Sequence, residues 1–298
     1  MRNILLVVDM EGCCGIYDMQ DIDDCRTKME REVQYIIDVL HKMGQDKVAV
    51  LDCHNDGRNL EKFCLNSKIK FYEHIWSIKD AQHYDCAFLI GFHSKNGVDG
   101  YFSHTIRSDI ADMLLGEKSI GEVGLLINWL SFYDVPVVYI SGDQSLIYEI
   151  QDYECEFVAT KSVDGEKISL EDIEQDIYKH IERALCYDKK CGYTEDNIVV
   201  KTVGMNYTKY LPEEIFDIRE EFVVFENTVE FVDRLKVLCD FLNISGMYQY
   251  KRISFLVAKL RKCPAVWADD TRAVELLNNR DWRTLNDEEI LYLSGVGN

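Results

Sequence analysis

The sequence predicts an α/β protein with a mostly parallel sheet flanked by helices. Two observations support this fold class. Short aliphatic runs alternate with segments of helical periodicity through the first half of the chain, which is typical of strands joined by crossover helices. Acidic residues and histidines follow these runs at the point where each ends. Because ligands of open α/β sheets bind outside the carboxyl ends of the strands, the second pattern also predicts where a site lies.

The composition is that of a folded domain, and it narrows the class of partner. Of 298 residues, 47% are hydrophobic and 29% are charged, which argues against disorder. A net charge of −20 disfavours nucleic acid and anionic membranes as partners. No apolar stretch approaches the roughly 20 residues of a membrane span, and we expect no signal peptide. Eleven cysteines without a framework spacing indicate reduced thiols and a cytoplasmic location.

The first expected strand covers residues 4–8, five aliphatic residues in succession, which is typical of a strand buried on both faces. Asp9 and Glu11 follow it directly. Residues two apart in an extended chain point the same way, so the two carboxylates should face one spot. An amphipathic helix should then cover residues 27–42, with Gly44 ending it.

Two more expected strands are each followed closely by a histidine. Residues 48–51 lead to His54, and residues 86–90 lead to His93. A further short element is expected between them at residues 70–75. The carboxyl ends of parallel strands share one edge of the sheet, so both histidines should approach the acids that follow the first strand.

The next stretch adds two candidate residues, one in a loop and one on a helix. Residues 94–109 form the expected loop and hold His104, and a helix should cover residues 121–132. That helix is apolar on almost every side, with Glu122 in its first turn. A carboxylate there favours the helix dipole, and beside so apolar a helix it can also serve as a metal ligand. A fourth strand is expected at residues 137–140.

The second half of the chain has a different pattern. Helices are expected at residues 169–185 and 228–242, and strands at residues 198–203 and 222–225. These elements indicate a smaller α+β portion that packs on the first.

We therefore expect three parts. Residues 1–150 form an α/β metal-binding catalytic portion, residues 151–245 a smaller α+β portion that completes the core, and residues 246–298 a helical C-terminal extension. The extension either caps the body through an apolar face or acts as a partner-binding or oligomer-modifying module. The apolar face comprises Ile253, Leu256, Val257 and Leu260.

The acids and histidines at the strand ends form a candidate two-metal site. Catalytic zinc takes nitrogen and oxygen ligands, and two metal ions that share a carboxylate can activate a water between them. Asp9, at the tip of the first strand, is the natural bridge. His104 is then a proton donor or a stabiliser of the oxyanion. Our assignment is Asp9, Glu11 and His54 on one ion, and Asp9, His93 and Glu122 on the other.

Each of these residues also has an ordinary explanation. A lone acid after a strand is usually a solvated loop residue or a helix cap, and a lone histidine more often bonds a neighbouring backbone group. No compact motif such as His-Glu-x-x-His is present. The joint position of the residues at the strand ends is what favours a metal site.

The same residues lie in motifs that resemble the bacterial dinuclear-zinc D-aminopeptidases associated with dipeptide-transport operons. The resemblance runs in order from Met1 to about Ser245. Its motifs are Asp9-Met10-Glu11-Gly12, Asp52-Cys53-His54, Gly91-Phe92-His93, Ser103-His104, Gly121-Glu122-Val123-Gly124-Leu125, Tyr133-Asp134-Val135-Pro136-Val137 and Gly142-Asp143, with weaker matches at Thr160-Lys161 and Asn227-Thr228-Val229-Glu230-Phe231.

The resemblance implies a metal-dependent aminopeptidase that hydrolyses short peptides, some members preferring D-residues at the amino terminus. It also implies two zinc ions in each subunit, and ring-shaped homo-oligomers whose active sites face an internal channel. The zinc ligands of the family fall on Asp9, Glu11, His54, His93 and Glu122, and its catalytic histidine falls on His104.

Three cysteines depart from the family pattern. Cys13 and Cys14 stand where the family usually has an aliphatic residue and then a small hydroxyl residue, and Cys53 stands where a small or hydroxyl residue is common. A thiol near zinc can be a ligand, a redox-sensitive site or a small buried side chain. We favour the small buried side chain.

The leading hypothesis is a zinc-dependent aminopeptidase that acts on a small peptide or amide through a two-metal-activated water. The alternative is a metal-dependent amidohydrolase acting on a non-peptide amide. A phosphoesterase is less favoured, because no Gly-rich phosphate cradle or Arg cluster lies near the five ligands in the sequence. A catalytically inactive metal-binding scaffold is also less favoured, because none of the six residues is substituted.

Overall fold

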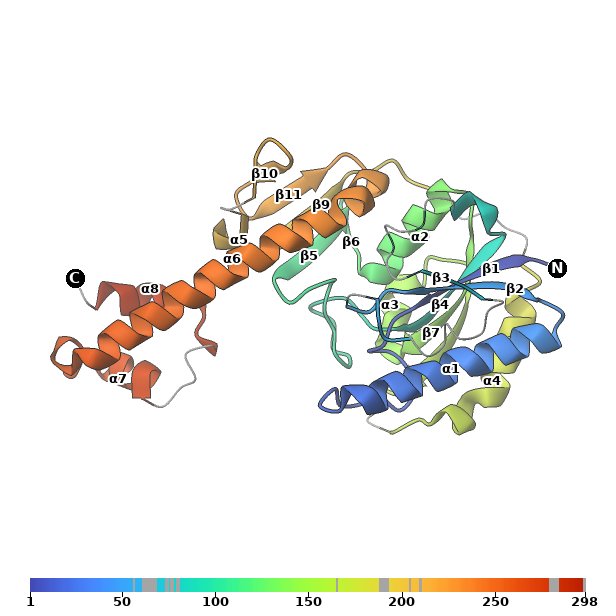
Figure 1. Cartoon of the computed structure of the whole chain (residues 1–298), viewed down its shortest axis with the longest axis horizontal. Helices are drawn as coiled ribbons and strands as arrows, with labels where there is room; N and C mark the ends of the chain where they lie inside the picture. The colour runs from blue at the N-terminus through green and yellow to red at the C-terminus, as the bar shows by residue number, and fades with distance from the viewer. Residues whose placement is uncertain are drawn as a thin grey trace.

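Two sheets and one long helix organise the fold (Figure 1). The computed structural model describes residues 1–55, 57–60, 69–72, 75, 78, 81–164, 166–187, 193–203, 205–208, 211–278 and 284–296. Within these residues, a parallel six-stranded sheet lies between helices, an antiparallel five-stranded sheet packs beside it, and helices end the described chain. The predicted fold class is therefore confirmed.

The parallel sheet has the strand order β3-β2-β1-β4-β7-β8. From β1 the chain steps one way to β2 and β3 and then the other way to β4, β7 and β8, so the topology switches between β1 and β4. Val8 pairs with Asp52 on one side and with Ile90 on the other, which brings the ends of β1, β2 and β4 to one level. The strands are β1 (Asn3–Val8), β2 (Lys47–Asp52), β3 (Lys70–Tyr72), β4 (Cys86–Phe92), β7 (Val137–Asp143) and β8 (Glu156–Lys161).

Alternate residues of β1 face two different layers of the molecule. Ile4, Leu6 and Val8 are buried against α1 (Ile22–Lys42) and α4 (Leu170–Ala184). Leu5 and Val7 belong to the core that contains α2 (Glu122–Phe132) and the second sheet. Figure 1 shows α1 and α4 together on one side of the sheet and α2 on the other.

Local capping sets where the two outer helices begin. The Asp21 carboxylate accepts a hydrogen bond from the backbone of Asp24, so α1 starts at Ile22, five residues before the predicted residue 27. Ser169 and Asp172 form a capping box at the start of α4, close to the predicted residue 169.

The antiparallel sheet has the strand order β10-β11-β9-β5-β6. Its strands β5 and β6 precede residue 150, whereas strand β8 of the parallel sheet and helix α4, which packs on that sheet, follow it. Each sheet therefore includes a segment from the other side of the expected boundary between residues 150 and 151. Strands β5, β6, β8 and β10 were not predicted. The strands of this sheet are β5 (Ile110–Leu115), β6 (Lys118–Ser119), β9 (Ile198–Thr202), β10 (Asp217–Arg219) and β11 (Phe222–Phe225).

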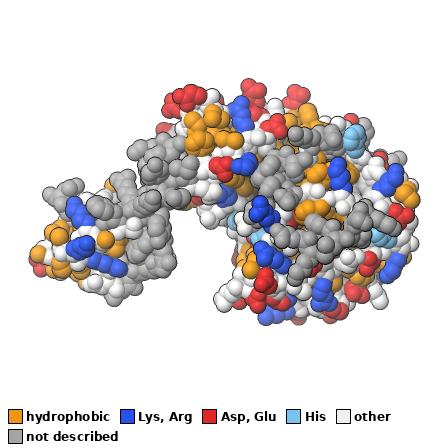
Figure 2. All heavy atoms as spheres, viewed as in Figure 1, with side chains coloured by type: hydrophobic (Ala, Val, Ile, Leu, Met, Phe, Trp, Pro, Cys, Tyr) orange, Lys and Arg blue, Asp and Glu red, His pale blue; other side chains and the backbone are white. Residues whose placement is uncertain are grey.

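The helix α6 (Thr228–Lys262) is 35 residues long and does not end at the predicted residue 242. Gly246 lies within it, since one helical glycine costs only about 1 kcal/mol. The distal half of α6, with α7 (Thr271–Asn278) and α8 (Asp287–Gly295), projects from the body as an arm (Figures 1 and 2). Val257 and Leu260 are buried in a small core of this arm, whereas the side chain of Ile253 lies outside the described residues.

Short elements complete the described chain. Of the expected element at residues 70–75, β3 covers Lys70–Tyr72, and residues 73 and 74 lie outside the described residues. Among the helices that the structure describes, none is both long and apolar enough to cross a membrane. The remaining helices are α3 (Ile147–Ile150) and α5 (Met205–Thr208), with single 3₁₀ turns at Ala81–His83, Gln144–Leu146 and Pro264–Val266.

Candidate metal centre

The segments that follow β1 and β4 touch backbone to backbone, and this contact brings their acids and histidine together. A Cβ atom on Gly12 would lie 1.9 Å from the carbonyl oxygen of Phe92. Gly91 has a φ of +72°, and a Cβ atom there would lie 2.3 Å from the Cys13 sulfur and 2.4 Å from the Asp9 carbonyl oxygen. Only glycine fits at either position, so the two glycines allow the close approach.

One group of side chains gathers at the ends of β1 and β2. The Nδ1 atom of His54 lies 2.7 Å from Oε2 of Glu11 and 3.5 Å from Oδ1 of Asp9. One candidate ligand atom from each of the three residues lies within 4.8 Å of the others. This spacing suits a single metal ion.

A second group gathers at the end of β4 and the start of α2. The Nε2 atom of His93 lies 3.5 Å from both Oδ2 of Asp9 and Oε1 of Glu122. His104 stacks on His93 with ring centroids 4.1 Å apart, and its Nε2 lies 3.9 Å from Oε1 of Glu122. Candidate ligand atoms of His93, His104 and Glu122 also lie within 4.8 Å of one another.

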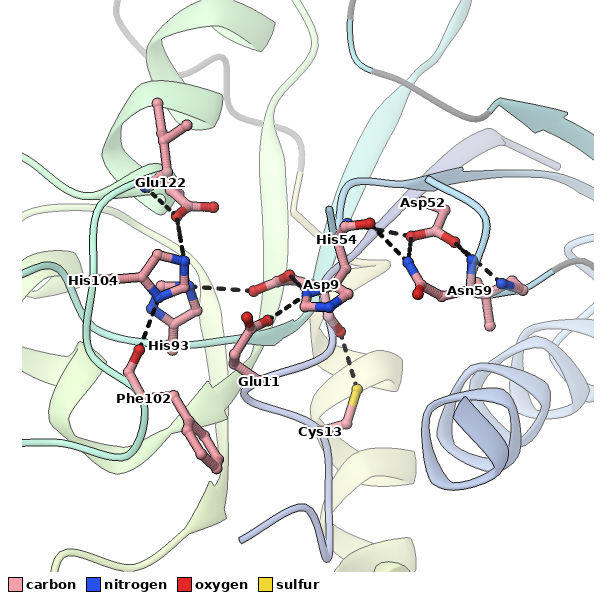
Figure 3. A network of polar contacts seen from close by, with 12 residues as sticks. Asp9, Glu11, Cys13, Asp52, His54, Asn59, His93, Phe102, His104 and Glu122 are labelled. Atoms are coloured by element: carbon pink, nitrogen blue, oxygen red, sulfur yellow. Dashed lines mark hydrogen bonds and ion pairs between the residues drawn. The ribbon is translucent and has the colours of Figure 1, made fainter. Parts of the chain in front are cut away.

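Asp9 joins the two groups. Its Oδ1 faces His54 and its Oδ2 faces His93, as Figure 3 shows. The structure therefore brings together all six residues that the sequence singled out: Asp9, Glu11, His54, His93, His104 and Glu122.

The charges of the cluster are strongly coupled. Burial, and then the Glu11 carboxylate, raise the pKa of Asp9 to about 6. Burial acts to lower the pKa of both His54 and His93, but hydrogen bonds and charges from the acids outweigh it and raise these pKa values to about 11 and about 10. Burial acts to raise the pKa of Glu11 and Glu122, yet contact with the histidines holds each below its ordinary value.

The donor set fits zinc. Oδ2 of Asp9 is buried and accepts no hydrogen bond from any described residue, although it faces Nε2 of His93 at 3.5 Å. A buried carboxylate oxygen without a hydrogen bond is costly. A cation beside it would remove that cost. Imidazole nitrogens and carboxylate oxygens are the ligands found in catalytic zinc sites.

Comparison with known proteins identifies the family of this chain. Residues 1–206 match peptidase family M55, described as D-aminopeptidase. The chain belongs to this family. The resemblance seen in the sequence is therefore confirmed.

One sequence match and one structure match come from Bacillus subtilis. A D-aminopeptidase of strain 168 is 25% identical over 163 residues, which is 50% of this chain and 59% of that protein, so the match spans less than two thirds of the relative. A solved structure is described as the zinc-dependent D-aminopeptidase DppA, a self-compartmentalizing protease. It has a TM-score of 0.71 and 19% identity, covering 80% of this chain and 97% of that one. At that identity the likeness shows the fold.

In this member of the D-aminopeptidase family, Asp52 and Asn59 position the loop that carries His54. The Asp52 carboxylate accepts hydrogen bonds from the backbone of His54 (3.2 Å), Asn59 (2.7 Å) and Leu60 (3.1 Å). The side-chain nitrogen of Asn59 donates to the His54 carbonyl at 2.7 Å. The sequence analysis gave neither residue this role, although an Asp two residues before a His is a recognisable turn signal.

Backbone contacts also orient the other ligands. Nδ1 of His93 lies 2.9 Å from the Ser94 carbonyl, and Nδ1 of His104 lies 2.8 Å from the Phe102 carbonyl. A proton on each Nδ1 leaves Nε2 directed at the site. The backbone of Ile106 donates to Oε1 of Glu122 at 2.7 Å.

Buried Lys161 is a further residue that sequence reasoning placed only in a weak motif. Its Nζ donates to the carbonyl of Glu11, and the Thr160 hydroxyl donates to the carbonyl of Gly12. Both come from the end of β8. They hold the backbone of the candidate ligand Glu11 and of Gly12, which follows it.

The cysteines beside the site lie outside both candidate ligand groups. The Cys13 thiol is buried and donates to the Asp9 carbonyl at 3.1 Å, and the backbone of Cys14 donates to Glu32 at 2.7 Å. Burial raises the pKa of both thiols, which keeps them protonated. Cys53 lies one residue before His54 and lines a pocket beside the site.

Proposed function

We propose that this protein is a zinc-dependent aminopeptidase that hydrolyses short peptides with a D-residue at the amino terminus. The observation that carries the proposal is the position of Asp9 between two groups of nitrogen and oxygen ligands, in a chain that belongs to the D-aminopeptidase family. Asp9, Glu11 and His54 are the ligands of one zinc ion, and Asp9, His93 and Glu122 are those of a second.

Two bound zinc ions would supply Lewis acidity for the scissile carbonyl and would lower the pKa of a water. The chain supplies the geometry. Asp9, Glu11 and Glu122 provide three buried or partly buried carboxylates that would balance the positive charge. The Ile106 backbone holds the Glu122 carboxylate, and Lys161 holds the backbone of Glu11. Such preorganised groups contribute to catalysis because they need no rearrangement during the reaction.

His104 is the proposed catalytic histidine. The side chain of His104 is 30% exposed, whereas that of His93, on which it stacks, is 1% exposed. Because Nδ1 of His104 is held by the Phe102 carbonyl, the Nε2 atom can pass a proton to the leaving amine or hydrogen-bond the oxyanion.

We further propose that the enzyme works in the cytoplasm as a ring-like homo-oligomer. The similar DppA structure is described as a self-compartmentalizing protease, which supports assembly. Cys13, Cys14, Cys25 and Cys86 are buried thiols, which supports a reducing compartment.

The test is a substrate screen on protein loaded with zinc, with metal content measured on the same sample. We expect hydrolysis of D-aminoacyl amides and D-aminoacyl dipeptides in preference to their L-counterparts, with no hydrolysis of p-nitrophenyl phosphate. Asp9→Asn should abolish hydrolysis and lower the zinc content, whereas Asp23→Asn, at a side chain that is 88% exposed on α1, should change neither. Full activity of Asp9→Asn, or hydrolysis of the phosphate ester alone, would refute the proposal.

A further inference from the structure

A pocket of about 370 Å³ opens beside the candidate metal centre. Ligand pockets commonly measure about 300–1,000 Å³, so this one is large enough for part of a short peptide. Four of its lining residues belong to the centre or adjoin it in sequence, among them Asn55, which follows His54. Glu122 is a candidate ligand, Cys53 precedes His54, and Phe92 precedes His93.

One wall of this pocket comes from the proximal half of α6. Leu235, Cys239 and Asn243 line it at intervals of four residues, which places them on one face of the helix. Leu125 and Leu126 of α2 and Ile106 from the loop before β5 also line the pocket. We call this space the α6 pocket.

The charged residues of the α6 pocket all have partners within the protein. Nε and Nη2 of Arg107 each lie 2.8 Å from the Asp109 carboxylate. Nζ of Lys236 lies 2.8 Å from Asp240. The Asp52 carboxylate is occupied by the loop that carries His54, and Glu122 faces the histidines. A charged side chain entering the pocket would therefore lose its hydration without gaining a free counter-charge among the described lining residues.

The walls of the α6 pocket are largely apolar, and its charged residues already have partners. From these observations, and resting on the function proposed above, we infer that the α6 pocket binds the side chain of the substrate's amino-terminal residue. It selects an uncharged, apolar side chain larger than that of alanine. Leu235, Cys239 and Asn243 set the size that is accepted. These three residues lie beyond residues 1–206, the part of the chain that matches the family, so the selectivity comes from a wall outside the matched segment.

The test varies only the amino-terminal residue of the substrate. In the wild-type enzyme, we expect kcat/KM for the amides of D-leucine and D-phenylalanine to exceed that for D-alanine amide, and the amides of D-lysine and D-glutamate to be the poorest. Cys239→Phe places a ring in the pocket and should lower kcat/KM for D-leucine amide and D-phenylalanine amide about tenfold or more relative to D-alanine amide. Val237→Phe adds the same ring to the outward face of α6, at a residue that is 37% exposed, and should leave the ratios within about twofold.

A second variant guards against misfolding of the first. Asn243 is exposed and lines the same pocket, so Asn243→Phe narrows the pocket without burying a ring in the core. Its effect on the ratios should have the same direction as that of Cys239→Phe. Circular dichroism and zinc content on each variant separate a loss of fold from a change in selectivity.

The outcomes separate this inference from the proposed function. Absence of hydrolysis of every aminoacyl amide by the wild-type, zinc-loaded enzyme would refute the proposed function. Hydrolysis with unchanged ratios in both pocket variants would refute the pocket assignment alone. The pocket variants could instead change only the preference for the carboxyl-terminal residue in a series of D-alanyl dipeptides. That result would also overturn the pocket assignment, because the pocket would then hold the residue on the other side of the scissile bond.

Discussion

The carboxylate of Asp52 shows how a residue outside the candidate ligand groups can position a proposed metal ligand, His54. It accepts three backbone hydrogen bonds from the turn that carries His54, and Asn59 closes that turn from its other end. The position of the His54 ring therefore depends on groups that do not touch the site. Outer contacts of this kind commonly change metal affinity by about 10- to 100-fold.

Asp52→Asn should accordingly weaken zinc binding by about 10- to 100-fold. In the variant, the amide nitrogen would replace a carboxylate oxygen that accepts hydrogen bonds in the wild type, and it would face backbone N–H donors without accepting from them. Competition with a chelator of known affinity measures this change. Asp23→Asn, on an exposed side chain, is the matched control. A lower melting temperature of the metal-free protein with unchanged zinc affinity would mean that Asp52 serves the fold only.

Sequence reasoning located the six candidate residues because their signal is local. Each one directly follows an apolar strand, begins an apolar helix or lies in the loop between them, and the register of β1, β2 and β4 brings those positions to one level. Lys161 gives no such signal. Its role arises from β8, which reaches the Glu11 carbonyl from 150 residues away in sequence, and only the folded chain shows that contact.

At the scale of elements, the contact between the ends of β1 and β4 is what assembles the centre. The φ of +72° at Gly91 and the close approach of Asp9 and Cys13 leave no room for a side chain. The two strand ends can therefore come together only with glycine at this position.

Gly91→Ala should destabilise the protein by roughly 3 kcal/mol or more, because it adds backbone strain and also displaces the Asp9 carbonyl. Gly97→Ala is the control, since φ there is +84° but nothing lies within 4 Å of the added atom, so strain alone should cost roughly 1–2 kcal/mol. Urea unfolding of the metal-free variants measures both values. Equal losses would show that the contact between the strand ends is not tight.

Strand β5 is one of the elements that the sequence did not predict, and a distant partner holds it in place. Strand β5 pairs with β9, more than 80 residues further along the chain, and its mixed sequence has no clean alternation of its own. The end of α6 was missed for a different reason. Gly246 resembles a stop signal, but the helix continues through it to a separate small core.

At the scale of the whole molecule, the arm and the body have separate cores. The core of the arm includes Val257, Leu260, Trp267 and Leu277, whereas α6 residues 231–242 belong to the core of the body. An arm whose described core is separate from that of the body is available for contacts between subunits. We therefore propose that residues 246–298 modify the assembly and do not cap the body.

Deleting residues 246–298 should leave a folded body, with a melting temperature within a few degrees of the full chain and with zinc bound. The assembly should be smaller, because the contacts made by the arm are gone. Sedimentation velocity measures the size, and the screen described above measures the activity. Aggregation with loss of the fold would instead support a capping role for the extension.

Because α6 is uninterrupted, it also fixes the angle, about its own axis, between the face that lines the α6 pocket and the face that carries the arm. At about 1.5 Å of rise per residue, its 35 residues extend for about 50 Å, and the face that lines the α6 pocket is set at a constant angle to the face that carries the arm. Inserting one alanine after Asn243 would turn the arm by about 100° about the helix axis, whereas inserting four would nearly restore its direction. The helix thus fixes both the distance and the angle between the proposed selectivity pocket and the arm.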